Sequence, residues 1–386
     1  MEPLVYHHDS RDYQEAASAA AAQGRVKMEE IIQKGLANAR AVAERVAAGD
    51  LQDQIVKAPA VHVYSPDDKT WRFRGGDELT NEYTLHNHAF GQIVENAGMP
   101  KAFVDKMVAQ ANGTRWGANL ITHNLREIFS HRPNQRNLIR SEGGVVKGFL
   151  SDKFRRIDSR HLLDSFMAGC TAMGLVPIDG VGLDTKVRMR AVLPKVFEPV
   201  PNEVMIFGLE WGNSDFGDGG HVVNLWTMRV WCTNLAIANN VLKQIHLGKR
   251  LDENIEYSAR TLELDTEANR SALKDAMRHT LGAGQVHKML ESIRTAGAKQ
   301  IEGKNDIDKL LKAALNKSEL EKVTDIFEGP DVQNVPEGKT RWRLSNAVSF
   351  FAQAEGVTAE RKLELQQVAG RIAGLRDAKA DAVTAA

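Results

Sequence analysis

The stretch "VVKGFLSDKFRRIDSRHLL", residues 145–163, changes from a two-residue alternation to the start of a helix. Successive side chains of a strand point to opposite faces, so the alternation predicts one basic face and one apolar face. The basic face would hold Lys147, Phe149, Ser151, Lys153 and Arg155, followed by Arg156. The apolar face would hold Val146, Gly148 and Leu150. The basic face of this strand is therefore a candidate surface for binding a polyanion.

Two other stretches repeat the pattern. In "TKVRMRAVL", residues 185–193, alternation places Lys186, Arg188 and Arg190 on one side. In "TWRFR", residues 70–74, it separates Arg72 and Arg74 from Trp71 and Phe73. Alternate side chains along a strand lie about 6.8 Å apart, a spacing that suits an extended phosphate backbone.

A solvated sheet face also carries Lys and Arg for solubility and edge protection, so each strand alone fits either interpretation. Depletion of acidic residues favours the functional one. Between Arg126 and His161 there are nine Lys or Arg against four Asp or Glu, a local net charge of +5. Phe149 would give this face a base-stacking platform, although a single Phe is more often a core residue.

The whole chain has the composition of a globular protein. It has 386 residues, 42% of them hydrophobic, and 50 basic residues balance 50 acidic ones. Any polyanion site must therefore come from local segregation of charge. Two cysteines, Cys170 and Cys232, predict neither a disulfide framework nor a zinc site. We expect no cofactor and no membrane span, and a cytoplasmic location.

The pattern along the chain predicts an α+β fold with a central, mainly antiparallel sheet flanked by helices. Residues 1–57 read as a helical N-terminal arm, residues 58–250 as an α+β core, and residues 251–386 as a helical region with a polar tail. Within the core we expect a hairpin over 58–76 and helices over 80–97, 100–112 and 159–174.

Three further features have competing interpretations. The Gly/Asp-rich turn with Asp215 and Asp218 predicts a hairpin with a mobile tip. The alternative, a calcium site, is disfavoured because the spacing of the carboxylates does not fit a calcium loop. Cys232 reads as buried and inert, since nothing places a base beside it. Lys249 and Arg250 either contact phosphates or end a helix, and the sequence favours neither.

Four blocks in order resemble the phage/plasmid-like family 932 of domains of unknown function. They are "GGVVKGFLSDKFRRIDSRHLL", "WGNSDFGDGGHVVNLWTMRVWCTNL", "IHLGKR" and "TRWRLSNAVSFFAQ". The resemblance covers roughly residues 79–357. Some members of this family are suspected relatives of single-strand annealing proteins such as the RecT and Redβ group. The resemblance implies a subunit of a ring or filament that holds DNA along a basic groove.

Together these observations predict a binding protein without turnover. It would self-assemble, bind single-stranded DNA and promote annealing during recombination of a phage or mobile element. Seven cations would pair with phosphates: Lys147, Lys153, Arg155, Arg156, Lys186, Arg188 and Arg190. The logarithm of the affinity would then fall with the logarithm of the salt concentration at a slope of about −5. The hairpin over 213–221 would clamp the strand. The alternative is a phage structural or host-interaction protein that buries partner surface against its helices.

Overall fold

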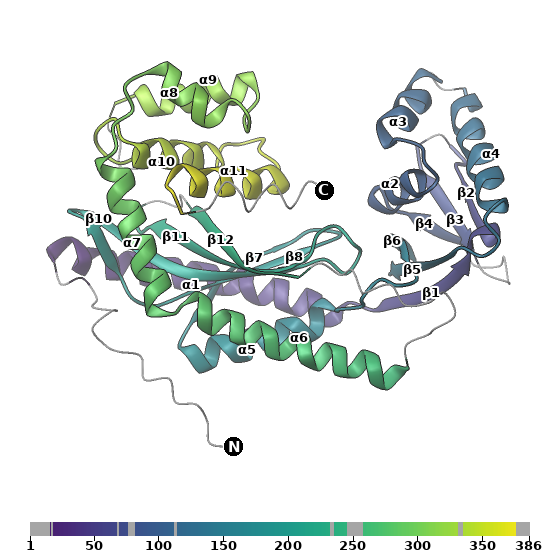
Figure 1. The fold of residues 1–386 in the computed structure, drawn as a ribbon, viewed down its shortest axis with the longest axis horizontal. Coiled ribbons are helices and arrows are strands. Elements are labelled where there is room, and N and C mark those ends of the chain that lie inside the picture. The colour runs from purple at the N-terminus through teal and green to yellow at the C-terminus, as the bar shows by residue number, and fades with distance from the viewer. Residues whose placement is uncertain are drawn as a thin grey trace.

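A computed structural model describes residues 16, 18–67, 69–75, 82–111, 114–231, 235–244, 258–330 and 335–375. It confirms the α+β class. Its strands lie in two sheets, each within its own lobe, instead of in one central sheet (Figure 1).

The N-terminal lobe is a sheet of six strands in the order β1-β5-β6-β4-β3-β2. Its strands are β1 (Leu51–Lys57), β2 (Val61–Tyr64), β3 (Trp71–Gly75), β4 (Glu82–Leu85), β5 (Arg136–Glu142) and β6 (Val145–Ser151). Its helices are α2 (Asn87–Asn96), α3 (Lys101–Gln110) and α4 (Trp116–Ser130). The helices cover one face of the sheet through a core that includes Phe73, Phe90 and Phe129.

The large lobe contains the second sheet, in the order β12-β11-β10-β8-β7 with β9 paired to β10. Its strands are β7 (Val176–Gly182), β8 (Val187–Val192), β9 (Phe197–Val200), β10 (Glu203–Asn213), β11 (His221–Arg229) and β12 (Leu235–Gln244). Its helices are α1 (Ala19–Ala48), α5 (Ser159–Met173), α6 (Ala259–Thr280), α7 (Ala283–Ala298), α8 (Lys304–Leu311), α9 (Lys317–Glu328), α10 (Arg341–Phe351) and α11 (Ala359–Ile372).

Helices enclose the second sheet. On one face, Trp211 of β10 stacks on Phe166 of α5, with ring centroids 6.0 Å apart. On the opposite face, Gln366 of α11 accepts a hydrogen bond from Arg190 of β8. Helix α1 runs along edge strand β7, so the predicted arm is part of this lobe and shares it with the C-terminal helices (Figure 1).

Several predicted elements are found. The hairpin over 58–76 corresponds to β2 and β3, and its turn is closed by Asp67, whose carboxylate accepts hydrogen bonds from the amides of Lys69 and Thr70. The expected helices over 100–112 and 159–174 correspond to α3 and α5.

Two predicted helical stretches are strands instead. The N-terminal helix ends at Ala48, and residues 51–57 form β1 beside β5. The helix expected from residue 80 begins only at Asn87, because residues 82–85 pair with β3 as β4. In both places pairing with another strand outweighs the local helical pattern.

Candidate nucleic-acid surface

Strand β6 contains a bulge that changes the faces predicted for it. Arg140 of β5 lies opposite Gly148, whereas the next residue, Ser141, lies opposite Val146. Lys147 is therefore an extra residue in β6, and residues on its two sides are shifted by one step. Val146 and Phe149 consequently share the core face, and the prediction that Lys147 and Phe149 share a basic face is wrong.

Phe149 is a core residue. Its side chain is only 4% exposed, and its ring lies 5.9 Å from that of Phe129. A ring packed in this way offers no face to a nucleotide base, so the stacking role predicted for Phe149 is wrong.

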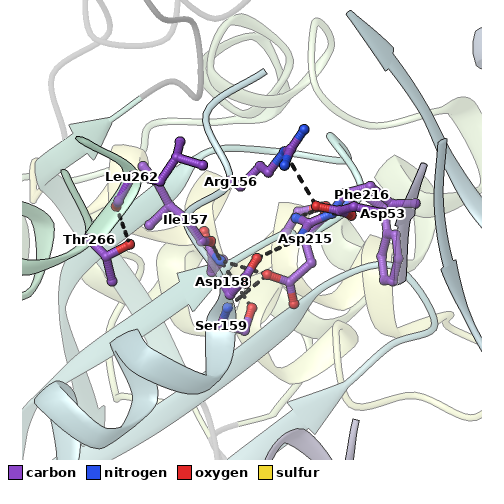
Figure 2. A network of polar contacts seen from close by, with 12 residues as sticks. Asp53, Arg156, Ile157, Asp158, Ser159, Asp215, Phe216, Leu262 and Thr266 are labelled. Carbon is purple, nitrogen blue, oxygen red and sulfur yellow. Dashed lines mark hydrogen bonds and ion pairs between the residues drawn. The ribbon is translucent and has the colours of Figure 1, made fainter. Parts of the chain in front are cut away.

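Six of the predicted cations have carboxylate partners. Lys147 pairs with Glu142, Arg155 with Asp265, Arg156 with Asp53, Lys186 with Asp218, and both Arg188 and Arg190 with Glu210. Figure 2 shows the contact between Arg156 and Asp53, 3.3 Å from Nε to Oδ2. Lys153 lies beyond the end of β6 and is half-buried, and no carboxylate in the described part of the chain pairs with it. Lys249 and Arg250 lie outside the described residues.

The pair on β8 belongs to the interior of the large lobe. Arg190 lies 2.7 Å and Arg188 3.6 Å from Glu210, which is 1% exposed. Burial acts to raise the pKa of Glu210, but the charges of Arg190 and Arg188 outweigh burial and hold that pKa below its usual value. Arg190 also contacts Asp179 at 3.2 Å, and the side chains of Arg190 and Arg188 are only 6% and 18% exposed, so this buried cluster offers no open surface to a phosphate.

The three basic strands do not form one surface. Strands β3 and β6 belong to the first sheet, whereas β8 belongs to the second. The predicted clamp is also not free: Phe216, at the tip of the β10–β11 hairpin, is 4% exposed because it packs against the N-terminal lobe. The hairpin prediction is confirmed, and Phe216 at its tip is packed against the N-terminal lobe instead of open to solvent.

One basic strand face remains open to solvent. Strand β3 alternates as predicted, with Phe73 fully buried and Trp71 stacked on Phe90 at 4.2 Å. Arg72 and Arg74 therefore point to the other side, where their side chains are 36% and 45% exposed. Directly opposite residues of β2 and β4 share this side. We name these residues the hairpin face: His62, Tyr64, Arg72, Arg74, Glu82 and Thr84.

Polar contacts order the hairpin face. Arg74 donates to Glu82 across 2.7 Å, and its guanidinium lies 5.1 Å from the centre of the Tyr64 ring. Arg72 donates to the Thr84 hydroxyl across 2.8 Å and lies 3.8 Å from Glu82. Two guanidinium groups therefore share the Glu82 carboxylate, and both side chains remain partly exposed to solvent.

The electrostatics of this face are cationic. The pKa of His62 is lowered, first by burial and then by the charges of Arg126 and Arg74. Arg126 comes from α4, so a third guanidinium contributes to the potential at this edge of the sheet. Sequence alternation identified Arg72 and Arg74, but it gave no reason to add His62 and Tyr64, which join them only through the β2–β3 register.

Neither a metal-ion cluster nor a membrane-spanning helix occurs within the described ranges. No group of three or more His, Cys, Asp or Glu side chains there is arranged to hold a metal ion. In the same residues, no helix combines the length and apolar character needed to cross a bilayer.

Comparison with known proteins found no matching family model, no similar curated protein and no similar solved structure. The resemblance to family 932 therefore stays a prediction.

Proposed function

We propose that this protein binds single-stranded DNA through the hairpin face and acts as a homo-oligomer in strand annealing or recombination of a phage or mobile element. The observation that carries the proposal is the exposure of Arg72 and Arg74 on one strand face beside an aromatic ring. The annealing role rests on the family resemblance alone.

The face has the two parts that sequence-tolerant binding of single strands uses. Alternate residues of β3 lie about 6.8 Å apart along the strand, a spacing that suits an extended sugar-phosphate backbone. Tyr64 lies directly opposite Arg72 and supplies a ring on which a base can stack. Duplex DNA keeps its bases paired and stacked, so a ring platform favours the single strand.

Charge neutralisation gives a quantitative test. Each phosphate contact in a single-strand complex contributes about −0.7 to the slope of log affinity against log salt. We expect the R72Q/R74Q protein to bind fluorescein-labelled oligo(dT) more weakly, with a slope shallower by about 1.4. The measurement is fluorescence anisotropy over a series of salt concentrations.

A matched control removes the same charge elsewhere. Arg40 and Arg278 are exposed on α1 and α6, where each pairs with a carboxylate of its own helix. R40Q/R278Q should keep the wild-type slope. Equal loss in both double variants, or absence of binding by the wild-type protein, would reject the hairpin face as the site.

Stacking is tested at Tyr64. Removing a ring that stacks one base costs about 1–3 kcal/mol, so Y64A should bind about 5- to 150-fold more weakly, whereas Y64F keeps the ring and should bind as the wild type does. Identical affinities for all three proteins would exclude stacking at this position.

A further inference from the structure

The tip of the β10–β11 hairpin, residues 214–219, reaches out of the large lobe. The Ser214 hydroxyl shapes it by donating to the carbonyl of Thr185 and accepting from the amides of Phe216 and Asp218. Gly217 and Gly219 have φ of 77° and 127°, values that favour glycine. The result is a compact turn that presents Phe216.

The N-terminal lobe forms a socket for the hairpin tip, mainly around the backbone of Phe216. The Phe216 carbonyl accepts hydrogen bonds from Gln92 Nε2 at 3.0 Å and from His88 Nε2 at 3.1 Å, both on α2. A Cβ on Gly148 would lie 3.3 Å from Phe216 Cα, so β6 approaches the tip with only a glycine between them. Lys147 Nζ lies 5.6 Å from the Phe216 ring centre.

Arg140 forms a second connection beside the socket. It is 1% exposed on β5, and it donates to Asp53 of β1 at 2.7 Å and to Asp158 at 2.6 Å. Its remaining nitrogen, Nη1, donates to the carbonyl of Asp215 at 2.9 Å. Asp215 in turn accepts from the amide of Ser159 at the start of α5 (Figure 2). One guanidinium therefore links the first sheet to the hairpin tip and to α5.

The covalent connections between the lobes are few by comparison. The described chain crosses at residues 49–50, between α1 and β1, and again at residues 152–158, between β6 and α5. A cavity of about 270 Å³ lies beside this joint, lined by Arg45, Glu142, Ser159, Lys186 and Phe216 among others. The joint therefore consists of two covalent linkers with a cavity beside them. The hairpin tip adds the buried side chain of Phe216 to the contact between the lobes.

We infer that the hairpin tip is a lock between the two lobes, and that the lobes pivot about residues 49–50 and 152–158 when Phe216 leaves its socket. The inference rests on the packing of the tip and is independent of the proposed nucleic-acid binding.

Spin labels on the two lobes test the lock. A full-length C232S protein carries nitroxides on cysteines placed at Lys106 of α3 and Lys309 of α8, and double electron–electron resonance reports the distance between them. The wild-type tip should give one narrow distribution. F216A removes the buried ring of the tip and G148V places a side chain against the backbone of Phe216, so both should broaden the distribution or add a second distance.

Two further variants keep the test decisive. F197A removes an equally buried ring from the large lobe, 5.0 Å from Phe207, and should leave the distribution narrow. Q92L removes one hydrogen bond to the tip without emptying a core. It replaces F216A or G148V in the measurement if either of those variants does not fold. Narrow, wild-type distributions in every folded tip and socket variant would overturn the inference, as would equal broadening in F197A.

Discussion

Asp215 is a carboxylate that the fold buries at the joint between the lobes. Burial raises its pKa to about 6, although the charge of Arg140 and the hydrogen bond from Ser159 act in the opposite direction. The folded protein therefore binds this proton more tightly than the unfolded chain does. The stabilising contribution of the protonated group is complete below about pH 4 and is lost as the pH rises through about 6.

The D215N protein lacks this titration but keeps a side-chain oxygen for the Ser159 amide. We expect the stability of D215N, relative to the wild type, to increase by about 1–3 kcal/mol as the pH rises from 4 to 7. Urea denaturation at several pH values measures the difference. Parallel curves for the two proteins would show that Asp215 titrates normally.

The cations show which part of the site the sequence could predict. Alternation correctly placed Arg72 and Arg74 on the other face of the strand from Trp71 and Phe73, because β3 is a regular strand with one buried face. Counting charge along the chain predicted that Arg155 has no acidic partner. This is wrong because its partner, Asp265, lies 110 residues away in the sequence. Lys186 and Asp218 are likewise brought together only by the second sheet. Such neutralisation depends on tertiary contacts that a local count does not contain.

Helix α1 and strand β7 make an unusually close contact between elements. A Cβ on Gly35 would lie 1.7 Å from the carbonyl oxygen of Ile178. This neighbour is backbone within a sheet, so it cannot move aside as a flexible side chain would. The helix approaches the strand this closely only because position 35 has no side chain.

We expect G35A to lose about 3 kcal/mol of folding free energy, at the upper end of the range for overpacking. Gly91 of α2 is the matched control, because a Cβ there would meet only the end of the Lys101 side chain, at 3.9 Å. G91A should gain up to about 1 kcal/mol from the better helix propensity of alanine. The midpoints of chemical denaturation compare the two, and equal midpoints would refute the assigned contact.

Elements were predictable where one local signal dominates. The Asp67 turn and the helix from residue 159 belong to this class. Gly148 is a local sign of the bulge, because an isolated glycine inside a strand often marks one, but only the register with β5 shows that Lys147 is the extra residue. The division of strands between two sheets is likewise a property of pairing, and composition along the chain does not encode it.

At the scale of the molecule, α3 and α4 carry exposed apolar side chains. Phe103 is 51% exposed, Trp116 47% and Leu120 39%. Large exposed apolar residues favour contacts with other protein surfaces. They are the structural feature that supports the alternative function, a structural or host-interaction protein, and they also suit assembly of this chain with itself.

Light scattering distinguishes these two roles. If the protein assembles on DNA, adding a long oligo(dT) should raise the scattered intensity several-fold above that of the protein alone, because successive subunits occupy one strand. Assembly of the same size with and without the oligonucleotide would favour the interaction role. The same light-scattering measurement on W116E then shows whether α4 supplies the contact between subunits.

The contact between α1 and β7 also sets an order of events during synthesis. Helix α1 ends at residue 48, and β7, the strand against which it packs, begins 128 positions further along the chain, at residue 176. At about 5–20 residues per second, translation takes roughly 6–26 s to cover that interval. Residues 51–151 emerge meanwhile and contain every strand of the N-terminal lobe. Helix α1 therefore cannot make its contact with β7 until all strands of the N-terminal lobe have been synthesised.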